Sequence, residues 1–108
     1  MSSNLTGAIY IRDNEWFKQK NIIKLGITQN IKDRENTYIT GEPNKGVFIM
    51  VILVQLEILN IIDNLLKQHF IDYNILTDGG NEFYKRDIIH LLIPYIDTLG
   101  IYYKVLTK

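Results

Sequence analysis

The stretch Gly7-Ala8-Ile9-Tyr10-Ile11, followed by Ile23-Lys24-Leu25-Gly26-Ile27-Thr28, decides the fold of this chain. Both runs are short and rich in isoleucine, and polar residues separate them, which is the pattern of two β-strands. We therefore predict strands over Gly7–Ile11 and Ile22–Thr28, joined by a long hairpin connection over Asp13–Asn21. Gly26 interrupts the second strand, either because a side chain would obstruct a close neighbour there or because the residue forms a bulge.

The next segments predict a helix and then a buried strand. Thr28 or Asn30 is a suitable N-cap for a short helix over Ile31–Ile39, and the Gly41-Glu42-Pro43 turn would end it. Val47–Val54 is a continuous apolar run rich in β-branched residues, which indicates a central strand buried on both faces.

The C-terminal half predicts two more helices and a closing strand. Apolar residues recur at helical spacing from Leu56 to Phe70, and a strong turn signal follows at 77–81. The expected elements after the turn are a short edge segment (Asn81–Tyr84), a helix (Asp87–Thr98) that kinks or breaks at Pro94, and a strand (Ile101–Leu106).

Length and composition favour a single α/β (α+β) domain over residues 1–108. The absence of cysteine excludes disulfides and thiolate metal sites. No apolar span reaches the roughly 18 residues of a membrane helix, and Met1–Thr6 is polar, so we expect a soluble intracellular protein with no membrane partner. The net charge is +0, so any nucleic-acid contact must rely on a local basic patch.

The two strand motifs and the residues after them resemble the GIY-YIG nuclease superfamily. Tyr10 lies at the place of the tyrosine in the first strand, Lys24-x-Gly26 at the place of the Tyr-x-Gly turn, and Arg34 eight residues past that glycine. Tyr38 follows one helical turn later. The resemblance is closest to the phage- and virus-type DNA-binding branch and spans roughly Gly7 to Tyr84. It implies a small GIY-YIG-like sandwich: a central, mainly antiparallel three-stranded sheet flanked by helices, here with an extra C-terminal helix and strand.

The resemblance also implies a catalytic apparatus for hydrolysis of DNA. Its members, by their family counterparts, are Tyr10 for activation of water, Arg34 for the phosphate, Lys24 and Tyr38 in support, and Gly26 and Lys32 in phosphate binding. Other interpretations of these residues stay open. A tyrosine in an apolar strand is often a core residue, and Arg34 between Asp33 and Glu35 also fits an exposed, salt-bridged helix face.

The metal ligand implied by the resemblance is Asp63, which takes the place of the family's glutamate. The cofactor would be Mg²⁺ or Mn²⁺. Because the aspartate is one methylene shorter than glutamate, it would displace the metal by about 1 Å, enough to lower the cleavage rate about 10²-fold. Glu57 is an alternative carboxylate, although a solvated residue in the first turn of a helix explains it as well. Glu82 either supports the site or fixes the turn before it.

Lysines and aromatic residues predict a basic-aromatic surface, or simply a solvated rim. They are Lys18, Lys20, Lys24, Lys32, Lys45 and Lys67, with Trp16 and Phe17. The sequence therefore favours a metal-dependent DNA endonuclease, with DNA as partner and with dimerisation or a DNA-recognition partner supplying specificity. The alternatives are a catalytically degenerate GIY-YIG fold that binds DNA or protein without cleaving, and an interaction module whose motif is accidental.

Overall fold

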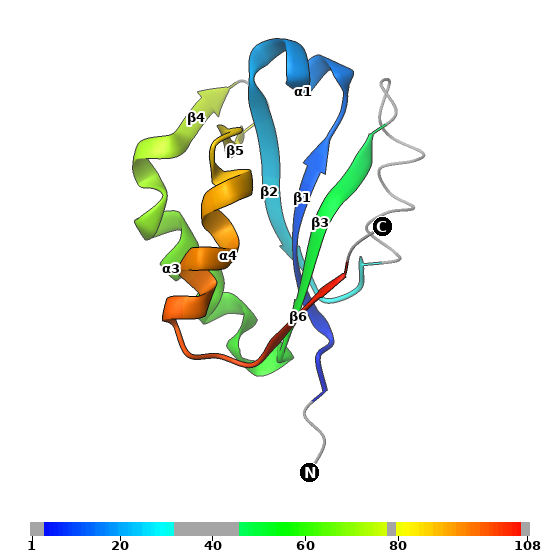
Figure 1. The fold of residues 1–108 in the computed structure, drawn as a ribbon, viewed down its shortest axis with the longest axis vertical. Coiled ribbons are helices and arrows are strands. Elements are labelled where there is room, and N and C mark those ends of the chain that lie inside the picture. Colours follow the sequence, from blue (N-terminus) through cyan, green and yellow to red (C-terminus); the bar gives the residue numbers. More distant parts are fainter. Residues whose placement is uncertain (1–3, 32–45, 78–79, 107–108) are drawn as a thin grey trace.

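The computed structural model describes residues 4–31, 46–77 and 80–106 (Figure 1). Its strands are β1 (Gly7–Asp13), β2 (Ile22–Thr28), β3 (Val47–Val54), β4 (Asn74–Thr77), β5 (Gly80–Lys85) and β6 (Tyr103–Leu106). Its helices are α1 (Glu15–Lys20), α3 (Leu59–His69) and α4 (Ile88–Thr98), with short 3₁₀ turns η1 (Leu56–Ile58) and η2 (Ile71–Tyr73) on either side of α3.

The strands form one antiparallel sheet in the order β4-β5-β2-β1-β3-β6. The predicted hairpin of β1 and β2 and the interior position of β3 are confirmed. The prediction of a three-stranded sheet is corrected, because six strands pair among the described residues. β5, expected as an edge segment, lies between β4 and β2. Short polar strands of this kind are held by pairing with distant neighbours, which local sequence propensity does not reveal.

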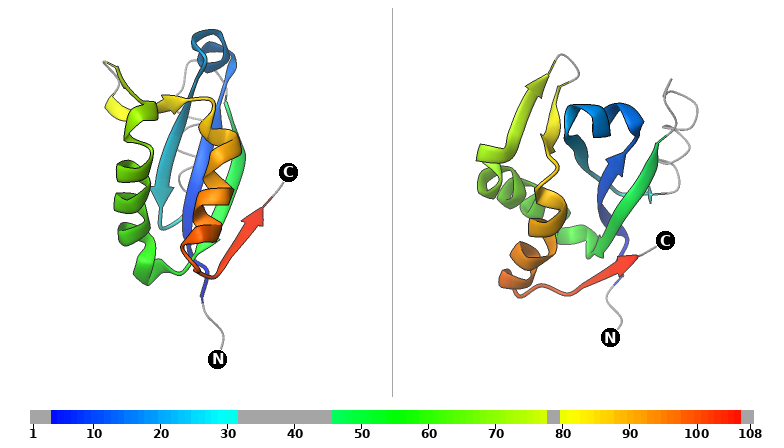
Figure 2. Two further views of the ribbon diagram at one scale, coloured as in Figure 1. Left: turned by 60° about the vertical axis from the view of Figure 1, so that its left-hand side comes forward. Right: turned by 45° about the horizontal axis from the view of Figure 1, so that its top comes forward.

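One face of the sheet carries the main core, which α3 and α4 cover (Figures 1 and 2). The inward residues of both helices recur every three or four positions and are fully or almost fully buried, as Leu59, Ile62 and Leu66 of α3 show. They pack against alternate residues of the central strands, such as Ile9 and Ile11 of β1. The hydrophobic patterns therefore predicted these helices correctly.

The opposite face of the sheet carries a smaller buried cluster of Ala8, Tyr10, Phe48 and Val51. Every residue of β1 is buried, so this strand is covered on both sides. The prediction that β3 is buried on both faces is wrong at its start, where Val47 and Ile49 are exposed.

The connection between β1 and β2 contains α1, which the sequence analysis missed. The Asn14 side chain caps this helix by accepting a hydrogen bond from the Phe17 backbone N–H at 2.8 Å. Phe17 is buried against Ile22 and Phe83 and holds the helix to the sheet. The missed signal was therefore one capping residue followed three positions later by one buried aromatic ring.

A partly buried ion pair joins this hairpin to the start of α4. The Arg86 guanidinium donates from Nη1 and Nη2 to the two carboxylate oxygens of Asp13, at 2.7 and 2.9 Å. It also donates to the Ile22 carbonyl at 3.2 Å, and Asp13 is 2 % exposed. The contact with Asp13 raises the pKa of Arg86, which stays charged.

The remaining predictions about elements have mixed outcomes. α4 continues from Ile88 to Thr98 through Pro94, so of the predicted kink or break at this residue the break does not occur. The helix predicted over Ile31–Ile39 lies almost wholly outside the described residues. No helix in the described parts of the chain is long and apolar enough to cross a membrane.

Candidate functional site around Gly26

Gly26 is a glycine because the ring of Tyr10 occupies the space of a side chain there. The two residues are paired across β1 and β2 in a register without a shift, so Gly26 is not a bulge. A Cβ at this position would lie 2.4 Å from the Tyr10 hydroxyl oxygen and 2.5 Å from its Cζ. The obstruction that the sequence analysis offered as one explanation of the glycine is therefore Tyr10 itself.

Tyr10 is 2 % exposed and belongs to the smaller cluster on the face away from α3. Its ring packs edge-on against Phe48, with the ring centroids 5.0 Å apart. This burial agrees with the interpretation of Tyr10 as a core residue. The hydroxyl reaches across to Gly26, the one position of β2 that has no side chain.

A small pocket of about 90 Å³ lies on the other side of Gly26. It opens where the pairing of β2 with β5 stops, after Lys24 and Phe83. The described residues that line it are Leu25, Gly26, Ile27, Asp63, Lys67, Glu82 and Tyr84. Gly26 therefore contacts Tyr10 on one face of the sheet and also contributes to this pocket.

The pocket holds two carboxylates, each paired with a lysine. Asp63 Oδ2 lies 3.0 Å from Lys67 Nζ, one helical turn later on α3. Glu82 Oε2 lies 3.4 Å from Lys24 Nζ on the neighbouring strand. The charges of the pocket are thus balanced, and neither carboxylate is exposed to solvent without a counter-ion.

Tyr84 adds a neutral phenol to this group. Burial raises the pKa of Tyr84 and nearby Asp63 and Glu82 raise it further, whereas Lys67 and a side-chain hydrogen bond with Asn74 oppose them. Tyr84 therefore stays protonated at neutral pH. The sequence analysis named neither Tyr84 nor Lys67 as site residues. The available signals were the spacing of four from Asp63 to Lys67 and of two from Glu82 to Tyr84.

The structure brings some of the predicted site residues together and leaves others apart. Gly26 and Asp63 share the pocket, and Lys24 reaches it through Glu82. Tyr10 does not line it, since its ring lies on the opposite face of the sheet. Glu57 is exposed in η1 and is not among the described lining residues. Three predicted residues, Lys32, Arg34 and Tyr38, lie outside the described residues.

Asp63 and Glu82 have the donor chemistry that a magnesium ion requires. Mg²⁺ prefers carboxylate oxygens and commonly uses one or two of them, with waters and substrate phosphates as its other ligands. The described residues hold no cluster of three or more histidine, aspartate or glutamate side chains. A magnesium ion on Asp63 and Glu82 would therefore need waters and a phosphate as its other ligands, and Lys24 and Lys67 would have to release the carboxylates.

Comparison of the chain with protein-family models, with curated proteins and with solved structures yields no match. What this protein does must therefore be argued from the residues gathered around Gly26.

The contact between Tyr10 and Gly26 gives a first testable prediction. Gly26→Ala should lower the free energy of unfolding by about 2 kcal/mol, because the new methyl group overlaps the phenol and forces the buried ring to move. Urea denaturation measures the change. A Tyr10→Leu background removes the overlapping atoms, so Gly26→Ala should cost much less there. An equal cost in both backgrounds would contradict this packing.

Proposed function

We propose that this protein is a divalent-metal-dependent endonuclease that hydrolyses DNA phosphodiester bonds at the edge of β2 around Gly26. The observation that carries the proposal is the double contact of Gly26. It lies under the Tyr10 hydroxyl on one side and lines the pocket of Asp63 and Glu82 on the other. A phosphate in this pocket would meet the carboxylate pair, Lys67 and the phenol of Tyr84, with Tyr10 on the other side of Gly26, and groups of these kinds are the ones that phosphodiester hydrolysis uses.

Each residue has a role in this proposal that follows from its chemistry. Tyr10 helps to activate the attacking water, Asp63 holds the metal, and Glu82 assists it. Gly26 allows close approach of the phosphate. The cationic or hydroxyl groups that would bind or orient the phosphate are Lys24, Lys32, Arg34 and Tyr38. Bound Mg²⁺ or Mn²⁺ would polarise the phosphate and lower the pKa of a coordinated water.

A second candidate is a degenerate GIY-YIG-like fold that binds DNA or a protein without cleaving. Two observations favour it. Asp63 is already paired with Lys67 at 3.0 Å, and Tyr10 is almost completely buried. The neutral net charge also favours weak DNA affinity that needs a second copy of the chain or a DNA-recognition partner.

A metal-removal experiment decides between these candidates. Purified protein is incubated with supercoiled plasmid in magnesium, in manganese and in excess chelator. We expect nicking that requires the metal and disappears on chelation, while an Arg34→Ala variant purified in parallel controls for contaminating nucleases. DNA binding without cleavage in either metal would remove the nuclease proposal and leave the binding module.

A further inference from the structure

A row of aromatic rings runs from the exposed end of α1 toward the candidate site. The ring centroids of Trp16 and Phe17 are 5.9 Å apart, and those of Phe17 and Phe83 are 5.5 Å apart. Phe17 and Phe83 are 6 % and 9 % exposed, whereas Trp16 is 44 % exposed. The two buried rings therefore form a base that holds Trp16 at the surface, where one indole face can meet a ligand.

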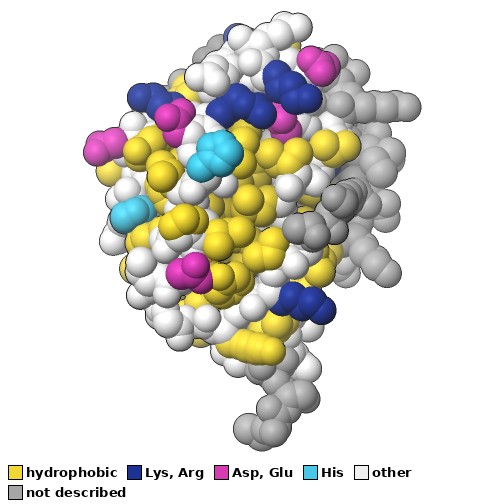
Figure 3. Space-filling model, in the orientation of Figure 1, with side chains coloured by type: hydrophobic (Ala, Val, Ile, Leu, Met, Phe, Trp, Pro, Cys, Tyr) yellow, Lys and Arg dark blue, Asp and Glu magenta, His cyan; other side chains and the backbone are white. Residues whose placement is uncertain are grey.

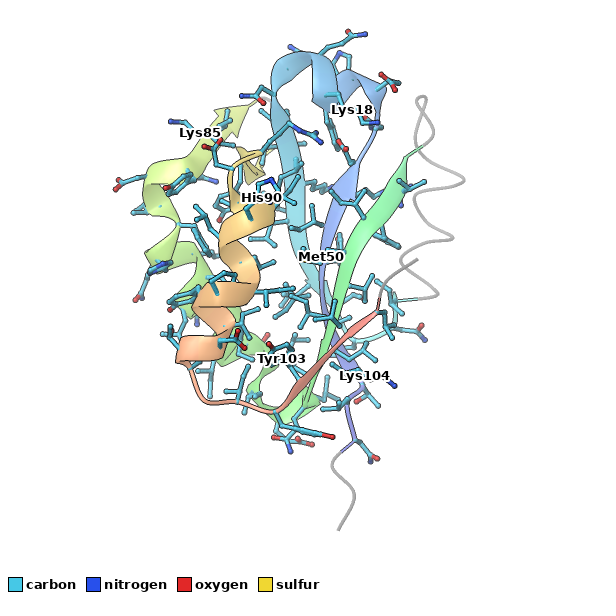
Figure 4. The ribbon with its side chains drawn as sticks, viewed as in Figure 1. Lys18, Met50, Lys85, His90, Tyr103 and Lys104 are labelled. Carbon is cyan, nitrogen blue, oxygen red and sulfur yellow. The ribbon has the colours of Figure 1, made fainter. Side chains whose placement is uncertain are left out.

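A lysine lies over a ring at each end of this row. Lys20 Nζ is 4.6 Å from the centre of the Trp16 ring, and Lys24 Nζ is 5.9 Å from that of Phe83. Lys18 adds little charge, because Glu15 lies 3.6 Å from it. Lys18 and Lys85 lie at the same end of the molecule as α1 (Figure 4), and on the face shown in Figure 3 Lys and Arg side chains gather toward that end with Asp and Glu side chains among them.

The inner end of the row lies beside β2, because Phe83 is paired with Lys24, two residues before Gly26. From Ile22, where α1 meets the strand, to Gly26 is four residues, or about 13 Å at about 3.3 Å per residue. A stacked nucleic-acid strand rises about 3.4 Å per nucleotide, so about four nucleotides span this distance. Lys24 lies between the two points, and it would have to leave Glu82, 3.4 Å away, to contact the strand as a point charge.

Exposed aromatic rings beside lysines are the usual means of binding unpaired bases, because every base has a face that stacks on a ring. We propose that Trp16 is a stacking platform for an unpaired base. The substrate class is then DNA that carries a single-stranded segment near the bond to be cut. This inference rests on the proposed function, which it deepens by naming the form of DNA that the site accepts.

The experiment uses the intrinsic fluorescence of Trp16, which is the only tryptophan in the sequence. The full chain is titrated with a single-stranded oligothymidylate of about 12 nucleotides, a length within known single-strand site sizes, and with a blunt duplex. We expect the single strand to quench the emission and to bind more tightly than the duplex. Fluorescence anisotropy of a labelled oligonucleotide measures binding independently of the tryptophan.

Three variants test the role of the ring. Trp16→Ala should weaken single-strand binding about tenfold, and Trp16→Phe should weaken it less because the ring is kept. Tyr102→Ala is the matched control, since Tyr102 is an exposed aromatic residue outside the row, and should leave affinity unchanged. Circular dichroism confirms that each variant is folded.

The outcomes separate this inference from the proposed function. Suppose that the protein cuts plasmid, but that Trp16→Ala leaves single-strand affinity unchanged or that binding does not quench the emission. This result would overturn the stacking role and leave the nuclease. Quenching and a Trp16-dependent affinity without cleavage would support the stacking role and remove the nuclease. A protein that neither binds nor cuts DNA would overturn both.

Discussion

Asp63→Asn should lower magnesium-dependent cleavage by about 10²- to 10³-fold, the size of loss typical when a group that stabilises the transition state is removed. Asparagine keeps the shape of the side chain but removes the charge that would hold the metal. The measurement is the initial rate of plasmid nicking over a range of magnesium concentrations. The variant should require more magnesium as well as cutting more slowly, since the metal site itself is weakened.

Variants around Asp63 sharpen this result. Lys67→Gln removes the ammonium group 3.0 Å from the carboxylate, so it should lower the magnesium concentration that cleavage requires. Glu57→Gln is the matched control, because Glu57 is an exposed carboxylate in η1 and not a described lining residue of the pocket. Wild-type rates in Asp63→Asn, or a large loss in Glu57→Gln, would mean that the metal is held elsewhere.

The length of the side chain at position 63 is a separate question. If aspartate is a shortened and impaired ligand, Asp63→Glu should raise the cleavage rate by up to about 10²-fold. If the pocket has adapted around aspartate, the longer side chain should collide with its lining and lower the rate. Either change in rate would tie catalysis to this pocket, whereas binding without cleavage in both proteins would favour the degenerate fold.

The elements that the sequence predicted well carry their signal locally. The apolar run Val47–Val54 has the pattern of a buried strand. The apolar residues within Leu59–His69 share one buried face only if the segment is a helix. Local hydrophobic patterns did not predict β4 or α1. β4 is four residues long and exists because it pairs with β5, and α1 is a six-residue helix held by one cap and one ring.

One part of the candidate site could likewise be predicted from local sequence, and another part could not. The neighbourhood of Tyr10 and Gly26 follows from the hairpin register, so the motif alone pointed to it. The pairing of Glu82 with Lys24 joins residues that are far apart in the chain and meet only because β5 lies beside β2. The burial that raises the pKa of Tyr84 is also a property of the assembled sheet, so no local pattern could reveal it.

Arg86→Met should be the most destabilising single change outside the apolar core, lowering the free energy of unfolding by about 3 kcal/mol. Breaking a buried ion pair by removing one partner costs about 3–5 kcal/mol, because the other charge is left buried. The lower end applies here, since the Arg86 side chain is 24 % exposed and water can reach the gap. Asp13, at 2 % exposed, would lose both guanidinium hydrogen bonds, and the Ile22 carbonyl would lose its donor.

Thermal denaturation and urea titration measure this loss, with Lys85→Met as the matched control at the exposed neighbouring position. Replacing both partners, as Asp13→Leu with Arg86→Met, should recover much of the stability, because no uncompensated charge then remains. A loss below about 0.5 kcal/mol in Arg86→Met, the range of ordinary surface changes, would show that the pair contributes little.

The pair also fixes the hairpin that carries α1 to the start of α4. Arg86→Met should therefore weaken single-strand binding through Trp16 at temperatures where the protein is still folded, and Lys85→Met separates that effect from the loss of a neighbouring positive charge.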